Sequence, residues 1–444
     1  MVTSTPFTNS AEVYKWISGF INFEKGQIKR DFSLDGMKIL AEMAGHPEKC
    51  APAFHIAGSK GKGSVTGMIT AILEASGKKI ARYASPHISD FRERISSGNS
   101  FFNEEIYTLT GNELKALVEK LPLQKREEPS FFELFTLWFF LCARQAHCDA
   151  MTVETGLGGR LDATNILDPL MSIITSIELE HTEILGDTIT AIAAEKAGII
   201  KKRRPLVLAE QTDEALAVFR EYAARNESPF FYFPEWAEVR NVRLDQKGTI
   251  FTLVLQNESF NDLFIPMPGE VQAKNSSLAI LALKTSLSEI TERDIRQGLA
   301  TFTLPARFER ISDTPPVVID GAHTKHSVNV CLQTFTSLYG NGGILVFGCA
   351  TGKDVLSMAE LCVRCFKKII ITKPGTFKES NPEEIYTAFL QAAERFKSNI
   401  EIIFQPQTNK AIEKAIELAM EQELPILGTG SFYLAGEIRK RFFP

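Results

Sequence analysis

The chain has 444 residues, of which 44% are hydrophobic and 23% charged, and its formal net charge is -5. This length favours two or three domains, and the composition is typical of a soluble globular enzyme. The lack of a basic excess argues against a nucleic-acid-binding protein, although a few local basic groups can still bind small anionic substrates.

Cysteine usage and hydropathy predict a cytoplasmic protein that does not span a membrane. The seven cysteines form no metal-ligand pattern: Cys362 and Cys365 have two residues between them, but no second pair follows. We therefore expect free thiols in a reducing cytosol. The start of the chain, MVTSTPF, lacks the features of a signal peptide. The most apolar run, Phe131–Ala143, is too short to cross a membrane and predicts a buried helix.

In the first half of the chain, short β-branched runs alternate with longer helical runs. This alternation predicts an α/β domain with a mostly parallel sheet. We expect helices at residues Ser64–Ser76 and Thr188–Ala197, and strands at Ala53–Ala57, Lys79–Tyr83, Ala150–Glu154, Met171–Ile177 and Pro205–Ala209.

The second half begins with a different pattern. Residues Phe230–Pro266 are predicted to form antiparallel strands that flank the main sheet, and a helix is expected over Val271–Ser286. A boundary is placed near Ser288–Pro305, after which a smaller α/β domain begins. We thus predict domains at residues 1–296 and 305–444, the second with strands at Val317–Asp320, Gly343–Phe347, Lys368–Thr372, Glu401–Phe404 and Pro425–Gly428.

The strongest local motif is the glycine-rich segment Gly58–Ser64, which follows a predicted strand and opens a helix. Backbone amides in such a turn form an anion site for phosphates together with the helix N-terminus. Lys62 would reach the terminal phosphates, and the Ser64 hydroxyl would bind Mg²⁺. The spacing is shorter than in the standard P-loop, and Gly63 separates the lysine from the serine.

Three further polar segments support a nucleotide site. Glu154–Asn165 begins at a strand end, where α/β proteins place their ligands. Glu180–Asp187, which contains His181, also follows a strand. Ala194–Gly198 places Lys196 near the end of an apolar helix. Taken singly, a histidine of this kind is more often structural and such a lysine is usually solvated.

Together these segments resemble the folylpolyglutamate/dihydrofolate synthases, which are members of the Mur ligase superfamily. The resemblance extends from about residue 10 to the end of the chain. It also includes Ser85–His87, Phe91–Ile95, Phe131–Glu133, Arg307–Glu309, Asp320–His323 and Gly430–Glu437, in the family's order.

The resemblance implies an ATP-binding domain, a glutamate-ligase domain and a role for each matching residue. Lys62 and the loop amides would hold the ATP phosphates, and Arg307 would reach them from the linker between the domains. Asp320 and His323 would supply nucleotide and glutamate contacts. The implied ATP-binding set is Gly58, Ser59, Lys60, Gly61, Lys62, Gly63, Ser64, Asn275, Arg307, Asp320 and His323.

The resemblance also implies a metal site and an acceptor site. Ser64, Glu154 and His181 would be Mg²⁺ ligands, and Lys196 matches a lysine that the family carries as a carbamate. The implied catalytic set is Lys62, Lys196, His181 and Arg307. Substrate contacts are expected from Ser85, His87 and Arg94.

The implied reaction is the ATP-dependent ligation of L-glutamate to a folate-type carboxylate, by a monomeric enzyme whose partners are small molecules. A carboxylate is a poor electrophile, so ATP would first convert it to an acyl phosphate, which the amine of glutamate then attacks. Transfer of a phosphoryl group between two anions requires cations and dipoles that neutralise charge. The acceptor would be dihydropteroate, tetrahydrofolate or both.

Four residues depart from the family pattern. Lys60 replaces the usual Asn, Glu180 replaces Asp, Thr324 replaces Asn, and Ala306 stands where Gly is common. None of these changes removes a group that phosphoryl transfer needs.

Three alternatives remain open at the level of sequence. A Mur-type ligase that acts on another acceptor would share the ATP and metal groups, although Ser85–Ile95 and Gly156–Asn165 favour the folate branch. A non-catalytic nucleotide-binding module should have lost Lys62 or a metal ligand, and none is lost. A P-loop kinase leaves Lys196 and the second domain unexplained.

Overall fold

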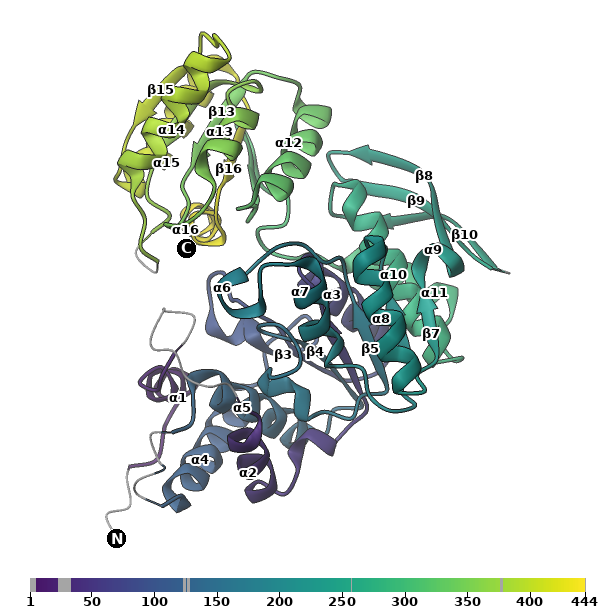
Figure 1. The fold of residues 1–444 in the computed structure, drawn as a ribbon. Coiled ribbons are helices and arrows are strands. Elements are labelled where there is room, and N and C mark those ends of the chain that lie inside the picture. The colour runs from purple at the N-terminus through teal and green to yellow at the C-terminus, as the bar shows by residue number, and fades with distance from the viewer. Residues whose placement is uncertain are drawn as a thin grey trace. The chain divides into compact units, whose positions relative to one another are not determined.

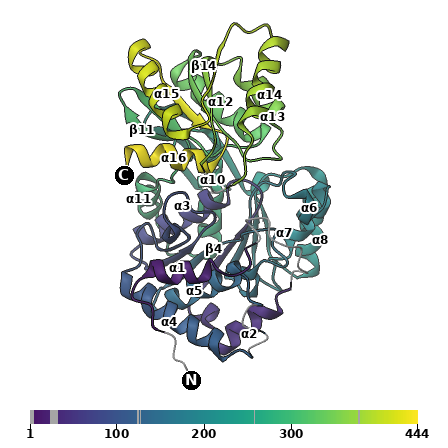
Figure 2. The same ribbon diagram turned by 90° about the vertical axis from the view of Figure 1, so that its left-hand side faces the viewer.

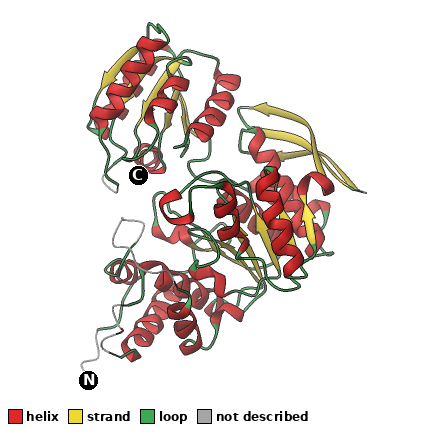
Figure 3. Cartoon of the chain, in the orientation of Figure 1, coloured by secondary structure: helices red, strands yellow, loops and turns green. Residues whose placement is uncertain are grey.

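The computed structural model describes residues 5–22, 33–122, 125, 128–256, 258–375 and 378–443, in which helices and strands alternate along most of the chain (Figures 1 and 3). The chain divides into two compact units. The first comprises residues 1–241, 251–264 and 273–302, and the second comprises residues 242–250, 265–272 and 303–444.

The first unit is built on a seven-stranded sheet in the order β3-β2-β4-β1-β5-β6-β7. All neighbouring strands are parallel except β2 and β3, which are antiparallel. The predicted parallel sheet is thus confirmed. Its strands are β1 (Ala53–Ala57), β2 (Ile80–Tyr83), β3 (Ile95–Ser97), β4 (Ala150–Glu154), β5 (Met171–Ile174), β6 (Leu206–Leu208) and β7 (Phe230–Tyr232).

Helices surround this sheet (Figure 2). They are α1 (Ser10–Ile17), α2 (Asp35–Met43), α3 (Lys62–Ala75), α4 (Glu104–Lys120), α5 (Phe131–Gln145), α6 (Thr182–Leu185), α7 (Ile189–Ala197), α8 (Asp213–Arg225), α9 (Phe233–Trp236), α10 (Glu270–Ser286) and α11 (Glu292–Thr301). Short 3-10 helices occur at Pro47–Lys49, Phe91–Arg94 and Ala163–Ile166.

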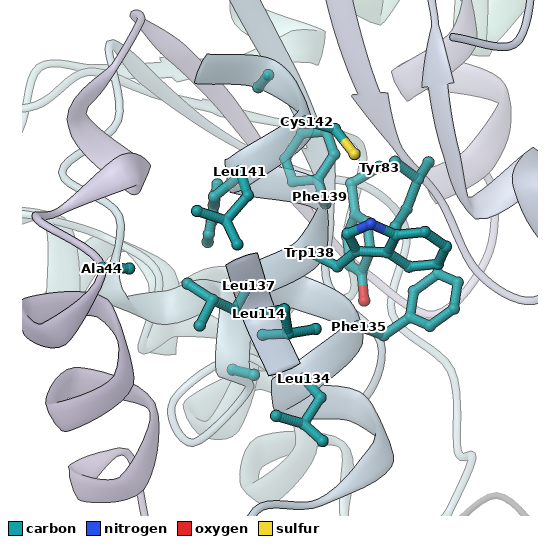
Figure 4. Close-up of a cluster of buried hydrophobic side chains, with 14 of the residues drawn as sticks. Ala44, Tyr83, Leu114, Leu134, Phe135, Leu137, Trp138, Phe139, Leu141 and Cys142 are labelled. Carbon is teal, nitrogen blue, oxygen red and sulfur yellow. The ribbon is translucent and has the colours of Figure 1, made fainter. Parts of the chain in front are cut away.

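The apolar run that predicted a buried helix is α5, which lies in an extensive hydrophobic core cluster. Trp138, Phe135 and Phe139 are fully buried, and Tyr83 of β2 lies against Phe139 with ring centroids 5.1 Å apart (Figure 4). The indole nitrogen of Trp138 donates to the carbonyl of Tyr107 on α4 at 3.2 Å. Burial of aromatic side chains on this scale anchors α4 and α5 to the sheet.

Strand register brings the polar segments to one edge of the sheet. Ile56 of β1 pairs with Glu154 of β4, and Ala57 pairs with Ile174 of β5. Because parallel strands share one carboxyl edge, the loops after β1, β4 and β5 all begin there. This edge therefore carries the glycine-rich loop, Glu154 and the segment that leads to His181.

The prediction for Phe230–Pro266 is partly wrong. Residues Phe230–Tyr232 are β7, a parallel edge strand of the main sheet, and α9 follows it. The remaining strands, β8 (Ala237–Asp245), β9 (Gly248–Leu255) and β10 (Glu258–Ile265), form a separate three-stranded sheet in the order β10-β9-β8. The two-residue connection between β8 and β9 is only compatible with antiparallel strands.

The second unit contains a six-stranded sheet in the order β11-β12-β16-β13-β14-β15, in which only β11 is antiparallel to its neighbour. This is the predicted smaller α/β unit. Its strands are β11 (Glu309–Asp313), β12 (Pro316–Ile319), β13 (Gly343–Phe347), β14 (Phe366–Ile371), β15 (Glu401–Phe404) and β16 (Ile426–Thr429); its helices are α12 (Lys325–Tyr339), α13 (Val355–Cys362), α14 (Pro382–Arg395), α15 (Thr408–Gln422) and α16 (Phe432–Phe442).

Two further features bear on the sequence predictions. The span Ser288–Pro305, predicted as a boundary, is mostly occupied by α11, which belongs to the first unit. Across the described ranges of the chain, none of the helices combines the length and hydropathy needed to cross a membrane.

Candidate active site

The glycine-rich loop packs closely against the side chains of Thr175 and Asn275. Gly58 has φ +145°, and a Cβ at this position would lie 1.8 Å from Thr175 Oγ1. Gly61 has φ +87°, and a Cβ there would lie 2.7 Å from Asn275 Oδ1. Only glycine fits both the dihedral angles and the space. The structure thus places Asn275, a predicted ATP residue on α10, directly beside the loop.

Helix α3 begins within the predicted phosphate loop. Lys62 is its first residue, and the N-cap Gly61 has no side chain to cap the helix. The first internal helical bond runs from Val65 N to Gly61 O at 2.9 Å. The preceding amides, including that of Ser64, have no acceptor within the helix, so this N-terminus suits an anion.

Lysine side chains converge beneath the loop. Lys62 Nζ and Lys196 Nζ both donate to the carbonyl oxygen of Gly58, at 2.9 Å and 2.8 Å. Lys196 also donates to Glu180 Oε1 at 3.1 Å, and Lys60 Nζ lies 3.8 Å from Glu180 Oε2. Two departures from the family pattern, Lys60 and Glu180, are therefore neighbours. The role of Glu180 as the counter-ion of this cluster was not predicted from the sequence.

The cluster shifts the pKa of both of its central groups. Burial, reinforced by the charge of Lys62, lowers the pKa of Lys196 to about 8, although Glu180 opposes the shift. Burial would raise the pKa of Glu180, but the charges of Lys62, Lys196 and Lys60 hold it at about 2. Lys196 is only 1% exposed, so it is not the solvated lysine that an isolated motif would suggest.

The segment Gly156–Asn165 braces the end of α7, which carries Lys196. Arg160 N donates to the carbonyl of Glu195 at 2.7 Å, and Arg160 Nε donates to its carboxylate at 3.0 Å. Asn165 Nδ2 donates to the carbonyl of Gly198 at 3.0 Å. A Cβ at Gly198 would lie 2.4 Å from the Cα of Arg160. The segment Gly156–Asn165 therefore binds the backbone before Lys196, at Glu195, and after it, at Gly198.

A network of buried hydrogen bonds holds residues 156–165 in place. Asp162 accepts the amides of Gly156 and Leu157, each at 2.9 Å, and the hydroxyl of Thr164 at 2.5 Å. Burial raises the pKa of the Asp162 carboxyl. His55 Nε2, on β1, lies 2.8 Å from the same Thr164 hydroxyl. Burial, with the charge of Lys201, lowers the pKa of His55 to about 3, so this histidine is neutral and structural.

The predicted metal ligands lie at the same edge of the sheet. Ser64 and Glu154 are 2% and 3% exposed, and Glu154 Oε2 accepts the amide of Ser85 at 3.3 Å. His181 is exposed, has φ +48° and precedes α6. Within the described parts of the chain, no three His, Cys, Asp or Glu side chains group closely enough to hold a metal. The predicted set contains only two such side chains, and its hydroxyl and carboxylate oxygens fit the preference of Mg²⁺.

The predicted acceptor residues form a second cluster. Arg94 is 1% exposed, and its Nε donates to His87 Nδ1 at 2.9 Å. The guanidinium lies over the rings of Phe131 and Phe135 at 5.7 Å and 5.8 Å. Tyr14 of α1 meets the ring of His87 edge-on at 6.1 Å. Arg94, His87 and aromatic rings thus come together.

A carboxylate that the sequence reasoning did not identify holds the loop around His87. Glu93 accepts the backbone amides of Ile88, Ser89 and Asp90 at 2.6 Å, 3.0 Å and 3.0 Å. The preceding Ser85–Pro86 bond is cis. Three amides on one carboxylate fix the loop in a single arrangement.

In the second unit, the ring of Phe432 contacts both Arg307 and His323, whereas Asp320 binds backbone amides. The Arg307 guanidinium is 4.0 Å from the centroid of the Phe432 ring, and His323 meets that ring at 5.7 Å. Asp320 accepts the amides of Phe308 and Ala322 at 2.8 Å and 2.7 Å, and burial raises the pKa of its carboxyl. The structure therefore shows a backbone-organising role for Asp320.

The structure shows the local backbone setting of two departures from the family pattern. Thr324 is the N-cap of α12 and forms a capping box with Ser327. Threonine and asparagine both serve at this position, so the replacement keeps the cap. Ala306 has φ +54°, a left-handed conformation that glycine adopts without strain and alanine does not.

Comparison with known proteins agrees with this architecture. Residues 56–283 match the Mur ligase middle domain, and residues 306–432 match the Mur ligase glutamate ligase domain. The fold and these two matches thus define an ATP-dependent ligase of the Mur type.

The relatives narrow the class. The chain is 33% identical to the dihydrofolate synthase/folylpolyglutamate synthase of Bacillus subtilis, over 98% of this chain and 99% of that one. It superposes on the Mycobacterium tuberculosis folylpolyglutamate synthase complexed with ADP with a TM-score of 0.89 at 27% identity, covering 98% of each chain. An FPGS–AMPPCP–folate complex matches with a TM-score of 0.83 at 29% identity, covering 98% of this chain and all of the other. The chain belongs to the dihydrofolate synthase/folylpolyglutamate synthase family.

Proposed function

We propose that this enzyme joins L-glutamate to the carboxylate of dihydropteroate, tetrahydrofolate or both. The names of the relatives, and the folate and nucleotide analogue in the related complex, support a folate acceptor. The acceptor carboxylate attacks the γ-phosphorus of ATP, and ADP leaves. The amine of glutamate then attacks the acyl carbon and forms the C–N bond. The acyl C–O bond breaks, phosphate leaves with the bonding electrons, and the nitrogen loses a proton. A Mur-type ligase with another acceptor is the alternative.

The observation that carries this proposal is the position of Lys196. An ordinary structural lysine would not need to be buried beneath a phosphate loop, with its Nζ on the Gly58 carbonyl. Burial also provides a pKa of about 8, which leaves a useful fraction of neutral amine near neutral pH. The neutral amine is the form that adds CO₂, and we propose that Lys196 is carbamylated in the active enzyme.

We assign the nucleotide phosphates to residues 58–64, with Asn275 beside the loop. Lys60 and Lys62 supply positive charge there, and the first amides of α3 supply dipoles. Within the second unit, Arg307, Asp320 and His323 are proposed to contact nucleotide or glutamate. Residues 1–296 would then be the ATP-binding domain and residues 305–444 the glutamate-ligase domain.

We propose that Mg²⁺ is held by Ser64, Glu154, His181 and carbamylated Lys196. When bound, it neutralises charge on the transferring phosphoryl group. The carbamate would exchange a cation for oxygen ligands, which a hard metal ion prefers. Glu154 also accepts the amide of Ser85, so it links the metal site to the loop that precedes His87.

The acceptor is assigned to Ser85, His87 and Arg94. A buried guanidinium over aromatic rings suits an anionic group attached to a flat ring system. The neighbouring Tyr14, Phe91 and Phe131 add aromatic surface, with Tyr14 and Phe91 stacked at 4.5 Å. We propose small-molecule partners only, a monomer, and a cytoplasmic location that suits the free thiols of all seven cysteines.

A phosphate-release assay tests the proposal. Purified enzyme with ATP, Mg²⁺ and L-glutamate is offered dihydropteroate or tetrahydrofolate, and ligated products are identified by mass. We expect glutamate-dependent phosphate release with at least one of them. Release without a ligated product, or none with either acceptor, would reject the folate assignment.

A further inference from the structure

The segment after β5 supports the phosphate loop from one side. The amides of Ser59 and Lys60 donate to the carbonyl oxygen of Ser176 at 2.9 Å and 3.4 Å. The hydroxyl of Ser59 donates to the carbonyl of Glu178 at 3.1 Å. The position of the phosphate-loop backbone therefore depends on the position of residues 175–178.

A side chain from the neighbouring strand end holds this segment on its other side. Gln211 follows β6, and its Nε2 donates to the carbonyl of Thr175 at 2.9 Å. Its Oε1 accepts the amide of Ile177 at 3.2 Å. The last main-chain bond between the strands runs from Ala209 N to Ile174 O at 2.9 Å, so the amide of Gln211 continues the pairing beyond the sheet.

The two bonds demand a particular chemical group. A backbone carbonyl only accepts and a backbone N–H only donates, so one side chain must offer a donor and an acceptor together. A primary amide does so at neutral pH; a hydrocarbon offers neither group, and a carboxylate offers only acceptors. Ile177 is 8% exposed, so its N–H has little access to water when the partner is lost.

The braced segment leads directly to the charged cluster. A Cβ at Gly58 would meet Thr175 Oγ1 at 1.8 Å, so Thr175 and the loop are in close contact. Two residues after Glu178 is Glu180, whose carboxylate lies 3.1 Å from Lys196 Nζ. A shift of residues 175–178 would thus move both the loop amides and the counter-ion of Lys196.

We propose that Gln211 is a positioning residue for nucleotide binding, which sets the phosphate loop through residues 175–178. The inference rests on the proposed assignment of the ATP phosphates to residues 58–64. Gln211 acts through the backbone, and no contact between it and substrate is required. Loss of its amide weakens the binding of ADP and ATP and leaves the binding of the acceptor largely unchanged.

The test compares Gln211→Met, Gln211→Glu and a matched control, Gln297→Met. Methionine keeps the length and unbranched shape of glutamine without its hydrogen bonds. Glutamate keeps an acceptor for Ile177 N but places an oxygen against the carbonyl of Thr175. Gln297 is an exposed residue on α11, where the same change touches none of these groups.

We expect both Gln211 variants to raise the ADP Kd, measured by calorimetry, and the KM for ATP by about tenfold, because a small misplacement of binding groups is costly. The KM for the acceptor should change less than about twofold, and Gln297→Met should match the wild type. A purely structural role predicts instead a lower Tm and a lower kcat with an unchanged KM for ATP.

Unchanged ADP affinity in a folded Gln211→Met or Gln211→Glu protein would overturn the inference. Equal increases in the KM for ATP and for acceptor would also overturn it, since they indicate general disorder. If Gln211→Met does not fold, the polar Gln211→Glu variant decides the matter. Failure of the wild-type enzyme to bind ADP would reject the proposed function itself.

Discussion

The ammonium nitrogen of Lys196 lies 3.1 Å from Glu180 Oε1, in a site where Lys196 is almost completely buried. A buried ion pair needs further hydrogen bonds to offset the loss of water, and the carbonyl of Gly58 provides one. Two other lysines near Glu180 weaken the hold on the proton of Lys196. These surroundings suit the proposed carbamylation, in which Lys196 loses its positive charge.

Lys196→Ala should lose about 100-fold or more of its ligase activity, because the proposed carbamate oxygens are removed. Formate or acetate should restore part of the activity by occupying the vacated space as an anionic oxygen ligand. Phosphate release with and without added carboxylate is the measurement. The control is Lys202→Ala, an exposed lysine nearby, which should be unaffected. Wild-type activity in Lys196→Ala would contradict the carbamate proposal.

Lys62→Ala should abolish ATP-dependent ligation and leave the fold intact. The side chain is half-buried at the start of α3, and it donates to the carbonyl of Gly58. Its loss removes a positive charge from the proposed phosphate site. Turnover and thermal melting should be compared with those of Lys78→Ala, beyond the other end of α3. A folded Lys62→Ala protein with normal turnover would disprove the assignment.

Arg94→Lys should raise the KM for the folate acceptor by about tenfold while the KM for ATP changes little, because lysine cannot reproduce the planar guanidinium. Arg94 donates to His87 and lies over two phenylalanine rings. Arg92→Lys is the matched control. Arg92 pairs with Asp90 in the same turn and is about one-third exposed. Equal effects of the two substitutions on the acceptor KM would argue against a specific role for Arg94.

The sequence predicted those parts of the molecule that local patterns determine. The bounds of β1 and β4 match the predicted runs Ala53–Ala57 and Ala150–Glu154, because both are short apolar strands buried along their whole length. Residues Phe230–Tyr232 were misassigned, since all three side chains of this edge strand are only half-buried and the run continues into further β-branched residues.

The sequence could not show which charged groups meet in space. Glu180 and Lys196 are sixteen residues apart, and their pairing depends on how α7 packs against the loop after β5. The backbone bonds of Glu93 and Gln211 were also hidden, because they go to main-chain groups, which are the same in every residue. The burial of Lys196 was equally hidden, since a lysine in an apolar helix resembles a solvated one.

The first unit should lose stability in acid because it contains the buried, neutral His55. The pKa of His55 is about 3 in the folded protein and about 6.5 in an unfolded chain. Between these values the unfolded chain binds a proton that the folded protein does not, so stability falls as pH falls below 6.5. Moving from pH 7.5 to pH 5.0 should cost about 2 kcal/mol through this histidine.

His55→Leu should therefore be less stable than the wild type at pH 7.5, by about 1 kcal/mol for the lost bond to Thr164, but should lose less stability on acidification. Urea unfolding at the two pH values, followed by tryptophan fluorescence, measures this. Trp16, Trp138 and Trp236 all belong to the first unit, so the signal reports on the unit that contains His55. Thr164→Val is the control: it breaks the same bond but keeps the histidine, and so should retain the full acid sensitivity. Parallel pH dependence in the wild type and His55→Leu would show that His55 is not a buried neutral group.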